Sequence, residues 1–219
     1  MISEIVEFKR YPGLLPQVAE IYTGCLSMIA GSLKAEPDLG IVDTPRGKIH
    51  SMASDFERML GHWSKREVLE GYMMGRLLGG AAAVALSTDG KAEGYALVDM
   101  RKTRGKKTER PYLADLFVRP SSHGRGIGRQ LLDIAELVSA GAMIEERDSC
   151  PASHQMLYTD AIAFRPSLGF YRNHGYEFTG DYGSAFPTVS VAKSIGSEIH
   201  FTYTSLMDGL SHILASRTV

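Results

Sequence analysis

A glycine-rich turn between a strand-like and a helix-like segment is the part of this sequence with the clearest chemistry. The segment reads Tyr112-Leu-Ala-Asp-Leu-Phe-Val-Arg-Pro-Ser-Ser-His-Gly-Arg-Gly-Ile-Gly-Arg-Gln-Leu-Leu132. A helix that starts after such a turn presents unpaired backbone N–H groups and the positive end of its dipole to an anion. Gly124, Gly126 and Gly128 have no side chains to obstruct the approach of an anion to the backbone. Arg125 and Arg129 supply positive charge at the rim. The turn therefore predicts a phosphate-binding site.

The spacing of these glycines differs from that of two common phosphate-binding loops. A Walker A loop ends in Gly-Lys-Ser/Thr, whereas Gly128 is followed by Arg129 and Gln130. A dinucleotide-binding turn needs Gly-x-Gly-x-x-Gly, whereas the glycines here are each separated by one residue. A purely structural role, in which the glycines only tighten a joint between strand and helix, stays open at this point.

A second segment, about 45 residues downstream, combines a short helix with aromatic residues. It reads Arg165-Pro-Ser-Leu-Gly-Phe-Tyr-Arg-Asn-His-Gly-Tyr-Glu-Phe178. Pro166 suits the first position of a helix, and Gly175 suits the left-handed position after its end. Packing in the core is the expected role of Phe170. Tyr171 can also pack there, but its hydroxyl is in addition a proton donor with an ordinary pKa of about 10.

Together, the two segments resemble motifs A and B of the GNAT superfamily of acetyltransferases. Motif A follows a strand and a Pro-containing turn with the pattern Arg/Gln-x-x-Gly-x-Gly/Ala, which here is His123-Gly-Arg-Gly-Ile-Gly128. Motif B is a short helix with Phe-Tyr, then a glycine, then an aromatic-rich strand, as in residues 165–178. The resemblance extends from residue 77 to about residue 178, roughly half of the chain.

The resemblance implies acetyl-CoA as cosubstrate and an N-acetyltransferase reaction. The pyrophosphate of acetyl-CoA would lie on the glycine turn, and its pantetheine arm and acetyl carbonyl on the backbone of the preceding strand. The implied cosubstrate site consists of Leu116, Phe117, Val118, His123, Gly124, Arg125, Gly126, Ile127, Gly128 and Arg129. An amine would attack directly, without an acyl-enzyme, and Tyr171 would act as general acid to the CoA thiolate. No metal is implied, because the histidines show no ligand spacing.

Three positions depart from the family pattern. His123 replaces Arg or Gln at the start of motif A, and Phe164 stands where motif B often has an asparagine that contacts pantetheine. The strand 112–118 and motif B are similar to the diamine acetyltransferase branch, but the glutamate implicated there as a base falls on Ala114. The acceptor therefore stays open between a small-molecule amine and a protein amine.

Strand alternation suggests which residues meet that acceptor. It places on one face Tyr112, Ala114 and Leu116, and on the other Asp115 and Phe117. We therefore expect Tyr112 to face the acceptor, with Tyr158 on the following strand, and Asp115 to pair structurally. Tyr158 or Asp160 can assist deprotonation through water, and no residue is assigned as the base. The helices within 14–75 should shape the acceptor site, and one or two of their methionines should line it.

The rest of the chain supplies elements that position these residues. Apolar periodicity predicts helices at 14–32, at 50–75 with a break near Gly61, after the glycine turn, at 166–174 and at 206–215. Predicted strands are 81–87, 94–100, 112–118, 155–159, 176–180 and 199–205, with loops at 36–48 and 101–110. With the resemblance, this order predicts an α/β (α+β) GNAT fold: a mixed, mostly antiparallel sheet flanked by helices, with a splayed central strand pair. We expect one domain over 1–219, with its recognisable core at 77–180 and a C-terminal strand and helix in 181–219.

Composition narrows the expected partners and setting. The 219 residues are 44% hydrophobic and 22% charged, and their net charge of −1 gives no reason to expect nucleic acid or a membrane as partner. Two widely separated cysteines and an N-terminal stretch without an apolar core favour a cytoplasmic protein. The basic run 101–110 is expected to be a solvated hairpin tip, the alternative being a contact to an acidic acceptor or to the CoA nucleotide. A homodimer is left open.

Two other functions are compatible with these residues. One is a GNAT-fold module that binds acetyl-CoA without turnover, for sensing or assembly. The other is a transferase that uses a longer acyl-CoA, since an apolar pocket at Leu116 and Phe117 can accept it. The tyrosine at position 171 favours an enzyme over a binding module.

Overall fold

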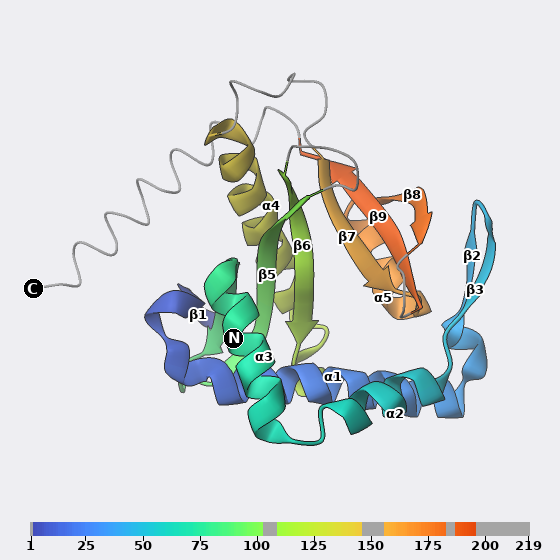
Figure 1. Ribbon diagram of the computed structural model, residues 1–219, viewed down its shortest axis with the longest axis horizontal. Helices are drawn as coiled ribbons and strands as arrows, with labels where there is room; N and C mark the ends of the chain where they lie inside the picture. The colour runs from blue at the N-terminus through green and yellow to red at the C-terminus, as the bar shows by residue number, and fades with distance from the viewer. Residues whose placement is uncertain (1, 103–108, 146–155, 183–186, 196–219) are drawn as a thin grey trace, which may run out of the picture.

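The computed structural model describes residues 2–102, 109–145, 156–182 and 187–195. Its main sheet has seven strands in the order β1-β4-β5-β6-β7-β9-β8, and every neighbouring pair is antiparallel except β6 and β7 (Figure 1). The strands are β1 (Ile2–Glu7), β4 (Ala81–Ser87), β5 (Ala92–Lys102), β6 (Glu109–Val118), β7 (Met156–Ile162), β8 (Glu177–Tyr182) and β9 (Thr188–Ser194). The mixed, mostly antiparallel sheet is thereby confirmed.

Helices cover both faces of this sheet. They are α1 (Leu15–Ala35), α2 (Ala53–His62), α3 (Arg66–Gly79), α4 (Ile127–Glu145) and α5 (Arg165–Asn173). Residues of α1 and α3 form a core with β4 and β5, whereas α4 and α5 pack against the opposite face. The second half of α1 leaves the sheet and packs with α2 in a third cluster. In Figure 1, α1 and α2 run together below the carboxyl ends of β6 and β7.

The long helices follow the predicted apolar pattern closely. Val18, Ile21, Cys25 and Ile29 are spaced by three and four residues, and all are buried in α1. Burying such a stripe stabilises a helix far more than intrinsic propensity does. The predicted helix 14–32 is confirmed and extends to residue 35. The helix predicted at 50–75 is divided, as expected, because α2 ends at His62 and α3 begins after a three-residue break.

Other predictions were incomplete or wrong. The predicted loop 36–48 contains a short 3₁₀ turn and a hairpin of β2 (Ile41–Thr44) and β3 (Gly47–His50). Strands of four residues are too short for a periodic signal, and Pro45 lies in the turn between them. The predicted loop 101–110 is shorter than expected, because β5 and β6 extend into it at both ends. The edge strand β1 and the strand β9 were not predicted.

The two central parallel strands separate soon after they meet. Only two residues of β6 have Cα partners on β7, namely Tyr112 with Tyr158 and Leu113 with Thr159. Beyond these pairs β6 continues to Val118, and Figure 1 shows β6 and β7 diverging above α1. The predicted splay is therefore present: beyond these pairs the facing edges of β6 and β7 are no longer partners, while β6 stays paired with β5 and β7 with β9.

Several predictions fall outside the described residues. These are the centre of the basic run (103–108) and the C-terminal strand and helix at 199–205 and 206–215. Within the described chain, no helix combines the length and the apolar character that a bilayer crossing needs. The same described residues contain no group of three His, Cys, Asp or Glu side chains arranged to hold a metal ion.

Candidate active site

A cleft of about 810 Å³ opens where β6 and β7 separate. Its lining comes from α1, α2, the end of β6, the glycine turn, β7 and α5. Most of the predicted site lies in it: Leu116, Phe117, Val118, His123, Gly124, Gly126, Ile127, Gly128, Arg129 and Tyr171. Residues from two distant motifs therefore line one cavity. Tyr112 and Tyr158 do not line it, because they are Cα partners at the closed end of the splay.

The glycine turn has the geometry of an anion cradle. Gly124 and Gly126 have φ angles of +75° and +79°, a region that side chains disfavour, and a Cβ on either would meet nothing within 4 Å. The first helical hydrogen bond of α4 runs from the Gln130 N–H to the Gly126 carbonyl at 3.2 Å. The N–H groups of the preceding helical residues, Ile127 and Gly128 among them, thus have no partner within the helix. These donors and the open space beside them suit a pyrophosphate.

The two arginines of the turn have different surroundings. Arg125 lies beside Glu93 at 3.6 Å and donates to the Ser122 hydroxyl at 3.2 Å, and the same hydroxyl bonds Glu93. Arg125 is the one residue of the predicted cosubstrate site that is absent from the cleft lining. It ties the turn to the start of β5. Arg129 lines the cleft and is mostly exposed, and its ion pair among the described residues is a long 3.8 Å contact to Asp133, so it can approach a phosphate.

His123 and Cys25 both hold the last carbonyl of β6. The Val118 carbonyl accepts a hydrogen bond from the Cys25 thiol at 3.0 Å and another from His123 Nε2 at 2.9 Å. The histidine at the start of motif A thus fixes the strand end to the turn. Burial raises the pKa of the Cys25 thiol to about 12, so this thiol is neutral and serves as a hydrogen-bond donor rather than a nucleophile.

A bulge in β6 changes which of its residues share a face of the strand. Leu97 pairs with Asp115 and Val98 pairs with Leu113, so Ala114 is an extra residue without a Cα partner. Ala114 packs with the core on the α1 and α3 side, whereas Leu116 packs with the core on the α4 side. The prediction that these two residues share a face is therefore wrong, because a bulge interrupts the alternation that the prediction assumed.

Tyr171 reaches the cleft from α5. Its side chain is only 8% exposed, and its hydroxyl is hydrogen-bonded to the side chain of Thr159 on β7. Burial raises the pKa of Tyr171 well above its usual range, and the negative charge of Asp115 adds to this. The phenol is consequently protonated at physiological pH. Phe170 packs against the core and lies 3.3 Å from a Cβ placed on Gly128, which links α5 to α4.

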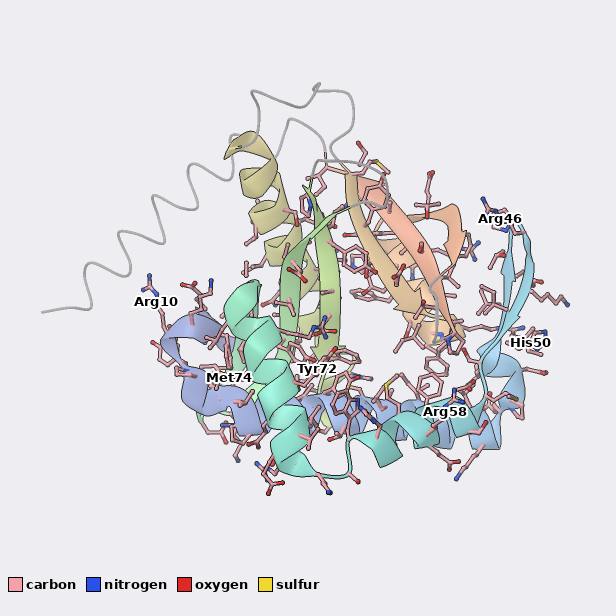
Figure 2. All side chains as sticks on the ribbon, viewed as in Figure 1. Arg10, Arg46, His50, Arg58, Tyr72 and Met74 are labelled. Carbon is pink, nitrogen blue, oxygen red and sulfur yellow. The ribbon has the colours of Figure 1, made fainter. Side chains whose placement is uncertain are left out.

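Asp115 forms an ion pair with Arg76 of α3, as the sequence predicts for a structural role. Arg76 Nη1 lies 2.9 Å from Asp115 Oδ2 and 3.2 Å from Oδ1, and the two side chains are 24% and 9% exposed. The guanidinium also lies 5.4 Å from the ring centre of Tyr72, which Figure 2 labels beside α3. Asp115 lines the cleft, but its charge is compensated.

Replacing Arg76 by methionine should therefore destabilise the fold. The carboxylate of Asp115 would remain largely buried after losing its ion pair with Arg76, and we expect the free energy of unfolding to fall by about 2 kcal/mol. Arg66→Met is a matched control on the same helix, because Arg66 pairs with Glu70 at 2.6 Å but is 59% exposed. That exposed pair should contribute little to stability, because solvent screens it. Urea denaturation measures both, and equal losses would contradict the assigned role of Arg76.

The side of the cleft away from the glycine turn consists of residues that the two motifs do not contain. The helices contribute Tyr22, Cys25, Leu26, Met28, Ile29, Ser32 and Met59, and β7 contributes Asp160 and Ile162. The expectation that one or two methionines line the cleft is confirmed by Met28 and Met59. Burial raises the pKa of Tyr22 to about 12, with Asp115 as a further cause, so its phenol is neutral. The helical period predicts α1 but does not tell core residues from cleft residues.

Comparison with known proteins agrees with this geometry. Residues 79–178 match the model of the Acetyltransferase (GNAT) domain family. A GCN5-related N-acetyltransferase from Rhodopseudomonas palustris has 16% sequence identity and a TM-score of 0.55, over 89% of this chain and 98% of that one. PaiA N-acetyltransferase from Thermoplasma acidophilum, solved in complex with coenzyme A, has 12% identity and a TM-score of 0.55, over 87% and 99%. No curated protein sequence matches the chain.

A third solved structure has the same fold. It is a histone acetyltransferase HPA2 and related acetyltransferase from Corynebacterium glutamicum, with 16% identity and a TM-score of 0.53, over 88% of this chain and 96% of that one. At such identities the likeness establishes the fold. The family match covers residues 79–178, a little under half of the chain, and the shared fold agrees with a GNAT acetyltransferase domain in that part. Members of this family transfer acyl groups and use acetyl-CoA.

Proposed function

We propose that the protein is an acetyl-CoA-dependent N-acetyltransferase in which Tyr171 is the general acid. The observation that carries the proposal is a single cleft that contains the free end of β6, the glycine turn and a buried tyrosine hydroxyl. The turn supplies N–H donors for the pyrophosphate, and Arg129 supplies charge beside them. The residues thus fit acetyl-CoA as the acyl-donor substrate.

The reaction needs few groups from the protein. The amine nitrogen gives its lone pair to the thioester carbonyl carbon, the carbon–sulfur bond breaks, and the sulfur leaves as a thiolate. Tyr171 gives its proton to that thiolate, and the proton lost by the attacking nitrogen returns to the phenolate through water. The amide and the CoA thiol are then the only products. Thr159 holds the phenol in place through its hydroxyl. Such proton donation typically contributes about 10²–10⁴-fold to the rate.

The pH dependence of the reaction follows from the burial of Tyr171. Since its pKa is raised, its protonated fraction does not fall as the pH rises toward the ordinary pKa of tyrosine. The rate should therefore increase with pH as the alkylammonium acceptor loses its proton, and show no descending limb between about pH 8 and pH 10. A kcat/KM profile over this range measures it. A descending limb below about pH 9 would indicate that another group supplies the proton.

Acyl-CoA and amine panels test the proposal and its two alternatives. Binding of acetyl-CoA is measured by calorimetry, and release of the CoA thiol is measured with and without amines. The proposal predicts binding together with amine-dependent thiol release. Binding without release for any amine would leave a non-catalytic module, and preference for a longer thioester would identify a different acyltransferase.

A further inference from the structure

The two ends of the cleft differ in charge. At the phosphate end, the lining includes Arg129. Among the described residues that line the cleft, the only acids are Asp115 and Asp160, on β6 and β7. Asp115 is compensated by Arg76 at 2.9 Å. Asp160 receives a hydrogen bond from the neutral Ser190 hydroxyl at 2.5 Å, and no cation of the described chain pairs with it.

The position of Asp160 puts this charge on the side of α1 and α2. Ile162, two residues further along β7, packs in the cluster of α1 and α2, and strand alternation places Asp160 on the same face. The last residue of β7 with a partner on β6 is Thr159, so Asp160 lies where the sheet has opened. Asp160 directly follows the residue that holds the Tyr171 hydroxyl.

The cleft walls formed by the cluster of α1 and α2 are largely apolar. They include Leu26 and Ile29 of α1, Met59 of α2, and Ile162 and Phe164 at the end of β7. A hydrocarbon chain can occupy such walls, but it leaves a carboxylate without a partner. An ammonium group with a hydrocarbon arm suits both the carboxylate and the apolar walls, since its charge pairs with the acid and its arm packs on the walls. A second charge on the arm would be buried without a partner.

We infer that Asp160 binds the acceptor, and that the acceptor is a primary amine with a single positive charge and an apolar arm. This inference rests on the proposed acetyltransferase function. Asp160 would hold the ammonium form of the substrate on the α1 and α2 side of the cleft that Tyr171 also lines. It would also stabilise the positive charge that develops on the nitrogen as the new carbon–nitrogen bond forms, after the nitrogen has lost one proton to water.

Two amines of equal length test the substrate class. Hexylamine and 1,6-diaminohexane differ only by a charge at the far end of the arm, and 2-phenylethylamine adds an aromatic arm. We expect kcat/KM for hexylamine and phenylethylamine to exceed that for the diamine by about tenfold or more. Equal or better turnover of the diamine would overturn the inference and leave the transferase function intact. A preference for octanoyl-CoA over acetyl-CoA would also overturn the inference, because the walls would then hold the acyl chain, and it would identify a different acyltransferase.

The role of Asp160 is tested with nearly isosteric variants. Asp160→Asn keeps the volume and the contact to Ser190, and should raise the KM for hexylamine by about 10- to 100-fold, with unchanged affinity for acetyl-CoA. Asp160→Glu should restore part of the loss. Calorimetry with hexylamine and the CoA-bound proteins should show the same order of affinities: the wild type binds most tightly, then Asp160→Glu, then Asp160→Asn.

Asp43→Asn is the control. Asp43 lies on the hairpin β2–β3 and is 78% exposed. This hairpin stands away from the main sheet in Figure 1, and Figure 2 shows Arg46 and His50 projecting from it. An unchanged KM for hexylamine in Asp160→Asn would overturn the assignment. Failure of the wild type to acetylate any amine would defeat the proposed function first, and the inference with it.

Discussion

Tyr171→Phe should lower kcat by about 10²–10⁴-fold while acetyl-CoA binds with nearly unchanged affinity. The substitution removes only a hydroxyl, and the ring that packs in the core with α5 and β7 is kept. The thiolate then leaves without a proton donor. Loss of the buried bond to Thr159 should cost about 1 kcal/mol of stability. Stopped-flow measurement of thiol release, with calorimetry for binding, separates the two effects.

Tyr176→Phe is the matched control for this substitution. Tyr176 is 2% exposed, its hydroxyl donates to Glu136 at 3.2 Å, and it does not line the cleft. Both variants therefore lose one buried hydroxyl and one hydrogen bond, at a similar cost in stability. Only the loss at Tyr171 should reduce kcat. If both variants keep the wild-type rate, or lose it equally, Tyr171 is not the general acid.

Gly126→Ala should weaken acetyl-CoA binding by about 10- to 100-fold. An alanine at a φ of +79° is strained by about 1–2 kcal/mol, and the turn can relieve the strain only by rotating its backbone. Such a rotation re-aims the N–H groups at the start of α4, which are the proposed donors to the pyrophosphate. The dissociation constant for acetyl-CoA, measured by calorimetry, reports the change.

A second glycine in the same conformation separates strain from binding. Gly90, in the turn between β4 and β5, has a φ of +76°, and a Cβ there also meets nothing within 4 Å. Gly90→Ala should therefore cost the same stability and leave acetyl-CoA affinity unchanged. Equal affinities for the two alanine variants would show that the glycine turn does not hold the cosubstrate.

Local signals account for the parts of the fold that the sequence predicts. The apolar run at 81–87 ends in an Asp-Gly turn and predicts β4 at its observed bounds. The glycine turn predicts the start of α4, and Pro166 and Gly175 mark the ends of the helix in motif B. Gly175 has the expected positive φ of +83°. In each case the signal lies within a few residues of the structure that it specifies.

The parts of the cleft outside the two motifs depend on contacts between distant segments. The pair Arg76–Asp115 joins residues 39 positions apart, and the hydrogen bond from Cys25 to Val118 joins residues 93 positions apart. Neither pair has a spacing that periodicity can detect. The bulge at Ala114 likewise depends on the register between β5 and β6, so strand alternation alone assigns the wrong face. The part of the cleft at the glycine turn was predictable because it belongs to one continuous segment of the chain.

Product analysis of a single reaction mixture tests the central claim most directly. The wild type is incubated with acetyl-CoA and a panel of primary amines, and the products are identified by mass spectrometry while the released CoA thiol is quantified. We expect an N-acetylated amine in a quantity equal to the released thiol, with no acetyl group retained on the protein. Firm binding of acetyl-CoA without acetylation of any amine would contradict the claim that this cleft is the active site of an N-acetyltransferase.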